Sequence, residues 1–225
     1  MKYKMYDEMM EQPEAIRKTF ASELENMENI SKLIENVDVI YLIGCGSSIS
    51  TCYSVKSALN SVCDLNVEVF TGYEFVYNKK LTIDENSVCI CASQSGETAD
   101  TLAALRRANE FNIATVSISN EPDSSMIKEA KYPIITLGDR ETAILGTKTY
   151  ITQLACLYQI LFAASDYDKK DEILDLQEHT FTLPNSWIWC SLGQISKVIT
   201  DGTHKTPNYV EKGVPFISIA NIIFC

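Results

Sequence analysis

One stretch decides the fold of this chain: Val39-Ile40-Tyr41-Leu42-Ile43-Gly44-Cys45-Gly46-Ser47-Ser48-Ile49. Its first five residues form an apolar, largely β-branched run, which predicts a buried strand. The two glycines allow the backbone to turn tightly and to approach a ligand, and the two serines offer hydroxyls where a helix leaves N–H groups unpaired. Because a helix N-terminus attracts anions, the stretch predicts a strand, an anion-binding loop and a helix start.

Strands and helices alternate as far as residue 164. Four further apolar runs predict strands at residues 66–70, 87–92, 113–119 and 132–137, and helical patterns cover residues 49–62, 98–110 and 147–164. Residues 7–36 form an amphipathic helical stretch whose main helix begins at Pro13. Apolar strands that alternate with helices predict a three-layer αβα sandwich with a five-stranded parallel sheet. Pro133 favours an edge position for the last strand.

A second serine-rich loop follows the third predicted strand, with the sequence Ser93-Gln94-Ser95-Gly96-Glu97-Thr98. In parallel sheets ligands bind beyond the carboxyl ends of the strands, where both serine loops fall. Their hydroxyls and N–H groups can replace the water shell of a phosphate without any lysine. The alternative is that these serines only form turns and cap helices; the presence of two such loops favours a ligand site.

Two kinds of nucleotide-binding site are alternatives for the first loop, a dinucleotide site and a Walker loop. Gly44 and Gly46 open a strand-to-helix turn, and Glu68 follows at the end of the next strand, as in a dinucleotide site. However, Ile49 occupies the place of the third glycine, where it would obstruct close packing of the helix on the strand. A Walker loop is excluded because the Gly-Lys-Ser/Thr sequence is missing.

Composition restricts the function further. The 225 residues carry a net charge of −11, which opposes binding to nucleic acid. There is no apolar stretch long enough to span a membrane and no signal-peptide pattern, so we expect a cytoplasmic protein without a membrane partner. The eight cysteines have no Cys-x-x-Cys spacing, and we expect no disulfide, no metal and no cofactor.

Three motifs resemble the sugar isomerase (SIS) family: residues 44–48, residues 93–101 and Glu141-Thr142-Ala143-Ile144-Leu145-Gly146-Thr147-Lys148. Within this family, the three motifs are most similar to those of the first isomerase domain of glutamine–fructose-6-phosphate aminotransferases and their two-domain relatives. Residues 11–16 fit that subgroup too. The resemblance implies a flavodoxin-like parallel sheet, a phosphosugar ligand of the fructose or glucosamine 6-phosphate type, and a homodimer formed through these domains.

The resemblance also implies roles for particular residues. Ser48, Ser93, Gln94, Ser95 and Thr98 would hold the phosphate, with Ser47 supporting the loop, while Ile144 and Gly146 match positions that approach the sugar. Gly146 stands where the family usually has a serine. The catalytic Glu, His and Lys of the resembled enzymes lie in a second isomerase domain that matches no part of this chain. We therefore expect no catalysis by this chain alone, unless a partner chain completes an isomerase or deaminase site.

Two residues within the site are acid–base candidates, Glu97 and Lys148. The alternative for Glu97 is that it accepts hydrogen bonds from N–H groups of the loop or of a helix start. The alternative for Lys148 is a structural ion pair.

The last part of the chain has a different character. We expect an N-terminal helical segment at residues 1–36, the phosphosugar-binding domain at 37–165, a linker at 166–179 and a separate fragment at 180–225. Residues 182–189, 192–195, 200–207 and 213–222 resemble the start of a target-recognition domain of type I restriction enzyme specificity subunits. This resemblance implies DNA as a partner only if the tail belongs to a complete recognition domain.

Overall fold

The computed structural model describes residues 4–60, 63–143 and 146–165. The predictions for Ile144, for the linker at 166–179 and for the fragment at 180–225 lie outside these residues. The strands are β1 (Val39–Gly44), β2 (Val67–Thr71), β3 (Ser87–Ala92), β4 (Ala114–Ser119) and β5 (Tyr132–Ile135). The helices are α1 (Lys4–Met10), α2 (Gln12–Ile34), α3 (Ser47–Leu59), α4 (Gly72–Tyr77), α5 (Ala99–Glu110), α6 (Ser125–Glu129) and α7 (Lys148–Ala164).

The five strands form one sheet in the order β2-β1-β3-β4-β5, and all neighbouring pairs are parallel. This confirms the predicted five-stranded parallel sheet. β5 lies at the edge of the sheet, as the position of Pro133 predicted. Proline has no N–H to donate to a neighbouring strand, so it is tolerated at an edge, where one side of the strand has no partner.

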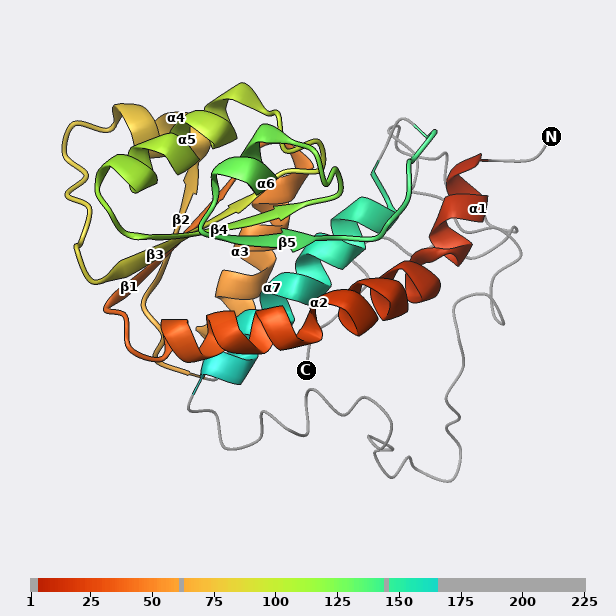
Figure 1. The fold of residues 1–225 in the computed structure, drawn as a ribbon, viewed down its shortest axis with the longest axis horizontal. Helices are drawn as coiled ribbons and strands as arrows, with labels where there is room; N and C mark the ends of the chain where they lie inside the picture. Colours follow the sequence, from red (N-terminus) through yellow and green to blue (C-terminus); the bar gives the residue numbers. More distant parts are fainter. Residues whose placement is uncertain (1–3, 61–62, 144–145, 166–225) are drawn as a thin grey trace, which may run out of the picture. The chain divides into compact units, whose positions relative to one another are not determined.

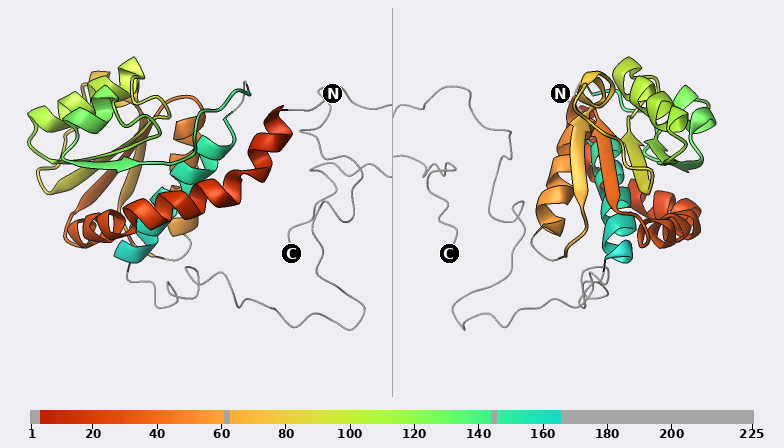
Figure 2. Two further views of the ribbon diagram at one scale, coloured as in Figure 1. Left: turned by 45° about the vertical axis from the view of Figure 1, so that its right-hand side comes forward. Right: turned by 90° about the vertical axis from the view of Figure 1, so that its left-hand side faces the viewer.

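Helices cover both faces of the sheet, which confirms the three-layer sandwich (Figures 1 and 2). Ile40 and Leu42 of β1 pack in a core with α2, α3 and α7. Tyr41 and Ile43, which alternate with them, pack on the opposite face with α4, α5 and α6. A strand that buries both sets of side chains must be apolar throughout, and this is why β1 has no polar position before its glycine.

Two short helices, α4 and α6, were not predicted. α4 begins with a capping box: the Thr71 hydroxyl accepts a hydrogen bond from the Glu74 N–H at 3.1 Å, and Glu74 accepts one from the Thr71 N–H at 2.9 Å. The hydrogen bond from the Thr71 N–H lowers the pKa of Glu74, so its carboxylate stays ionised. α3 begins at Ser47, two residues before the predicted start.

The six cysteines of the described residues are unpaired thiols. Cys52 and Cys156 are fully buried, and burial raises the pKa of each to about 12. These two thiols are therefore packing groups rather than nucleophiles.

Membrane-spanning segments were also sought. In the part of the chain that the structure describes, no helix has both the length and the apolar character needed to cross a bilayer.

Candidate functional site

Between β1 and β3 the chain changes its direction of travel across the sheet. From β1 the chain passes through α3 to β2, and it then returns through α4 to β3 on the other side of β1. Such a switch point leaves a crevice at the carboxyl ends of the two strands, where ligands bind in open α/β sheets. Gly44 at the end of β1 pairs with Ala92 at the end of β3, so the two serine loops begin side by side.

The first serine loop, residues 44–48, is shaped by its glycines. A Cβ on Gly44 would lie 2.8 Å from the backbone nitrogen of Ile49, so only glycine fits beneath the start of α3. Gly46 has a φ of 59° and forms the N-cap of α3 without any side-chain cap. Ser47 is exposed, and Ser48 is buried, with a hydroxyl that forms no hydrogen bond to any described residue.

The second serine loop, residues 93–98, is held by hydrogen bonds among its own members. The buried Ser93 hydroxyl lies 2.9 Å from the Thr98 hydroxyl and accepts a hydrogen bond from the Gly96 N–H at 3.2 Å. The Ser95 hydroxyl accepts one from the Glu97 N–H, also at 3.2 Å. The side chains of Gln94 and Ser95 are exposed. Thr98 is the N-cap of α5 and gives that helix no side-chain cap.

The two loops are in contact through the first turn of α5. The Thr101 hydroxyl donates a hydrogen bond to the Cys45 sulfur at 3.4 Å. Two helix N-termini and several hydroxyls therefore gather at one end of β1 and β3. This arrangement is suited to binding an anion, because uncapped helix N-termini present N–H groups and a partial positive charge.

Asn120 directly follows β4, and the sequence analysis missed its role. Its N–H donates to the Gln94 carbonyl at 3.0 Å. Its side-chain oxygen accepts from the Gly138 N–H at 2.9 Å, and its side-chain nitrogen donates to the Asp139 carbonyl at 3.2 Å. Asn120 therefore links the second serine loop to the segment after β5. A polar residue at a strand's carboxyl end was the signal for it.

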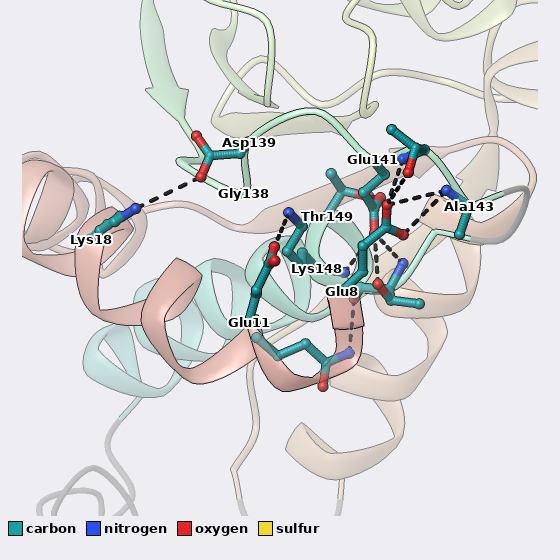
Figure 3. Close-up of polar contacts among 12 residues, drawn as sticks. Glu8, Glu11, Lys18, Gly138, Asp139, Glu141, Ala143, Lys148 and Thr149 are labelled. Atoms are coloured by element: carbon teal, nitrogen blue, oxygen red, sulfur yellow. Dashed lines mark hydrogen bonds and ion pairs between the residues drawn. The ribbon is translucent and has the colours of Figure 1, made fainter. Parts of the chain in front are cut away.

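The segment after β5 carries Gly146, which is exposed, and leads into α7. Glu141 accepts hydrogen bonds from the N–H groups of Thr147 at 2.5 Å and Lys148 at 2.7 Å, and also from the Thr149 hydroxyl (Figure 3). Burial raises the pKa of Glu141, but these hydrogen bonds outweigh burial and lower it overall. An ionised Glu141 thus accepts hydrogen bonds from the backbone N–H groups at the start of α7, which have no partner within the helix.

The two acid–base candidates both make structural contacts. Glu97 accepts a hydrogen bond from the Ser125 N–H at 2.6 Å, at the start of α6. The Lys148 side chain is 4% exposed, and its Nζ lies 2.7 Å from the Glu11 carboxylate (Figure 3). These are the contacts expected from the alternative interpretations, a helix-start acceptor and an ion-pair partner.

A cavity of about 200 Å³ lies between α2 and the segment after β5. Lys18 and Lys148 both line it, and each faces a carboxylate: Lys18 lies 3.7 Å from Asp139, and Lys148 is paired with Glu11. Because both cations are paired, this cavity is a poorer place for a phosphate than the serine loops.

Comparisons with known proteins agree with this geometry. The model of the SIS domain family matches residues 33–163. A glutamine–fructose-6-phosphate aminotransferase (isomerizing) of Clostridium tetani is 32% identical over 212 residues, covering 89% of this chain and 35% of the relative. The corresponding protein of Wigglesworthia glossinidia brevipalpis is 36% identical over 171 residues, covering 71% of this chain and 28% of the relative.

A solved structure is also similar. The C-terminal domain of glucosamine-fructose-6-phosphate aminotransferase from Francisella tularensis superposes with a TM-score of 0.66 at 28% identity, covering 76% of this chain and 49% of that one. The chain thus spans about a third of the length of the curated relatives and about half of this structure.

Proposed function

This chain belongs to the SIS domain family, and we propose that it binds a phosphosugar of the fructose 6-phosphate or glucosamine 6-phosphate type. The observation that carries the proposal is the meeting of two serine loops and two uncapped helix N-termini at the switch point of the sheet. The names of the aminotransferase relatives include fructose 6-phosphate, which supports this substrate class.

In this proposal the phosphate lies between the two serine loops. Ser48, Ser95 and one of the paired Ser93 and Thr98 hydroxyls donate to it, the exposed Gln94 donates from its amide, and Ser47 supports the first loop. The N–H groups that open α3 and α5 complete the donor set. The resemblance to the family implies that the sugar extends toward Gly146; Ile144, the other position that it implies, lies outside the described residues.

Thermal shift and calorimetry test the proposal. Fructose 6-phosphate, glucosamine 6-phosphate, inorganic phosphate and unphosphorylated fructose are titrated separately to millimolar concentration. The phosphosugars are expected to raise the melting temperature most, phosphate less, and fructose not at all, because a ligand stabilises the state it binds. If neither phosphosugar stabilises the chain, the proposal is overturned.

A catalytic role is a second candidate, favoured by the isomerising aminotransferases among the relatives. In this candidate a second isomerase domain, supplied by a partner chain or by a second copy in a homodimer, completes the site. Isomerase and deaminase assays on each oligomer separated by size decide it. An inactive homodimer would remove the self-completing version.

DNA recognition by the fragment at 180–225 stays a prediction. The acidic charge of the chain opposes it. The alignment with the C. tetani relative covers 89% of the chain, whereas residues 1–177 make up less than four fifths of it, so similarity to the aminotransferase continues past residue 177. Salt-sensitive binding to a DNA duplex, lost on deletion of residues 178–225, would support DNA recognition.

A further inference from the structure

The segment after β5 is fastened to the two N-terminal helices by side chains. Figure 3 shows Glu8 and Glu11 pointing from these helices toward this segment. Glu8 belongs to α1, whereas Glu11 directly precedes α2 and Gln12 opens it. Gln12 donates to the Thr147 carbonyl at 3.2 Å, and Glu11 pairs with Lys148. Thus α1 and α2 contact the segment that leads into α7.

Glu8 makes the most contacts of the three. One of its carboxylate oxygens accepts from the Thr142 N–H at 2.6 Å, the Thr142 hydroxyl at 3.0 Å and the Ala143 N–H at 3.2 Å. The residue is only 6% exposed. The hydrogen bond from the Thr142 N–H lowers the pKa of Glu8, so the carboxylate is ionised at neutral pH. Hydrogen bonds to an ionised acceptor are the stronger kind.

Two carboxylates therefore hold the backbone on the two sides of Gly146. Glu8 holds the N–H groups of Thr142 and Ala143 before it, and Glu141 holds those of Thr147 and Lys148 after it. Each side is thus fixed by a charged acceptor. Among the described residues, no hydrogen bond or ion pair joins Glu8 to residues 44–48 or 93–98.

We propose that Glu8 is a positioning residue for the sugar side of the site, which rests on the phosphosugar-binding function proposed above. By holding Thr142 and Ala143, it fixes the segment that presents Gly146 to the sugar. The phosphate is held by the serine loops, which have their own hydrogen bonds. Loss of Glu8 should therefore weaken recognition of the sugar and leave recognition of the phosphate unchanged.

The test compares two ligands and two kinds of variant. E8A is expected to weaken fructose 6-phosphate binding about tenfold and to leave the affinity for inorganic phosphate within about twofold. E8Q keeps one acceptor oxygen and is expected to fall between E8A and the parent. E74Q is the matched control, since Glu74 also accepts a backbone N–H through an ionised carboxylate, but in the capping box of α4. It should alter neither affinity.

Amide hydrogen exchange supplies an independent measurement. In E8A and E8Q the N–H groups of Thr142 and Ala143 should exchange faster, while that of Thr71 should not change; E74Q should show the reverse. Equal losses of both affinities, or no loss in either, would overturn the positioning role. If the parent chain fails to bind fructose 6-phosphate, the proposed function fails. Unchanged hydrogen exchange at Thr142 and Ala143 in the Glu8 variants would separately show that Glu8 does not hold the segment. Should E8A not fold, E8Q carries the same comparison.

Discussion

The two serine loops occupy equivalent places at the ends of neighbouring strands, yet they are built differently. The loop at 44–48 is shaped by backbone contacts: Gly44 lies directly beneath the start of α3, and the Ser48 hydroxyl has no partner among the described residues. In the loop at 93–98, the Ser93 hydroxyl bonds both to Thr98 and to the Gly96 N–H. The first loop leaves the Ser48 hydroxyl free for a ligand, whereas the second loop uses the Ser93 hydroxyl to hold its own backbone and one hydroxyl hydrogen of the Ser93–Thr98 pair within the loop.

Because of this difference, substitutions in the two loops should affect ligand affinity and folding stability to different extents. A hydroxyl without a partner can be removed at little cost to folding, while a hydroxyl that satisfies a buried N–H cannot. The first loop should therefore tolerate changes to its serines but not to its glycine, and the second should be sensitive at Ser93. Substitutions in the two loops test this contrast.

The largest effect is expected from Gly44→Ala. The new Cβ would lie 2.8 Å from backbone atoms of Ser48 and Ile49, and backbone atoms cannot rotate away. The start of α3 must shift, at a cost of about 3 kcal/mol, the upper part of the range for overpacking. In a chain of this size that corresponds to a fall of roughly 6–12 °C in melting temperature. Differential scanning calorimetry measures it.

Gly146→Ala is the control for this variant. A Cβ on Gly146 would meet only side-chain atoms, the nearest being the Thr149 hydroxyl at 3.3 Å. Its effect on stability should stay within about 0.5 kcal/mol. Equal losses for the two variants would show that glycine at 44 is not required by the close approach of α3.

The next largest effects are the changes in stability and ligand affinity expected from Ser93→Ala and Ser48→Ala. Ser93→Ala leaves the buried Gly96 N–H without its acceptor, which should cost about 1–3 kcal/mol of stability as well as ligand affinity. Ser48→Ala should leave stability within about 0.5 kcal/mol and weaken phosphosugar binding about tenfold, the loss of one hydrogen bond to a charged group. Urea unfolding and calorimetric titration measure the two quantities.

Ser54→Ala serves as the control for both serine variants. Ser54 lies in the same helix as Ser48, and its hydroxyl donates to the Ser50 carbonyl within the helix. This variant should change neither quantity appreciably. A stability loss in Ser48→Ala as large as that in Ser93→Ala would contradict the contrast between the loops.

The smallest effect is a gain in affinity for fructose 6-phosphate, which is expected from Gly146→Ser. The serine restores the hydroxyl that the family usually has at this position, and its Cβ fits with a small movement of Thr149. One neutral hydrogen bond to the sugar should tighten fructose 6-phosphate binding about two- to tenfold without changing phosphate binding. Gly146→Ala should not reproduce the gain. An unchanged affinity in Gly146→Ser would place the sugar elsewhere.

Much of the fold could be predicted from the sequence because each strand has a mostly apolar run, and in β1 this run covers both faces. The periodicity was less informative where burial is partial: Leu24 stands at helical spacing between Phe20 and Met27 in the first long helix but is 40% exposed. α4 and α6 are too short for periodicity to show. The capping box of Thr71 and Glu74 is a local sequence signal for the start of α4.

The candidate site was predictable where it follows strand ends. Both serine loops stand out as Gly- and Ser-rich sequences after apolar runs. The place of Asn120 at a strand end was a signal, but its partners and those of Glu8 could not be predicted, because they are distant in sequence: Glu8 bonds to Thr142, and Asn120 to Gly138 and Asp139. Such pairings depend on how the helices and loops pack, which a single sequence does not encode in any local pattern.

The composition of the serine loops has a kinetic consequence. Neither residues 44–48 nor residues 93–98 include lysine or arginine, while the whole chain carries a net charge of −11. A phosphate dianion that approaches from a distance is therefore repelled, and attraction begins only within reach of the helix ends and hydroxyls. Salt screens the long-range repulsion, with a Debye length of about 10 Å at 0.1 M. Added salt should thus speed the capture of the ligand, the opposite of its effect on a site lined with cations.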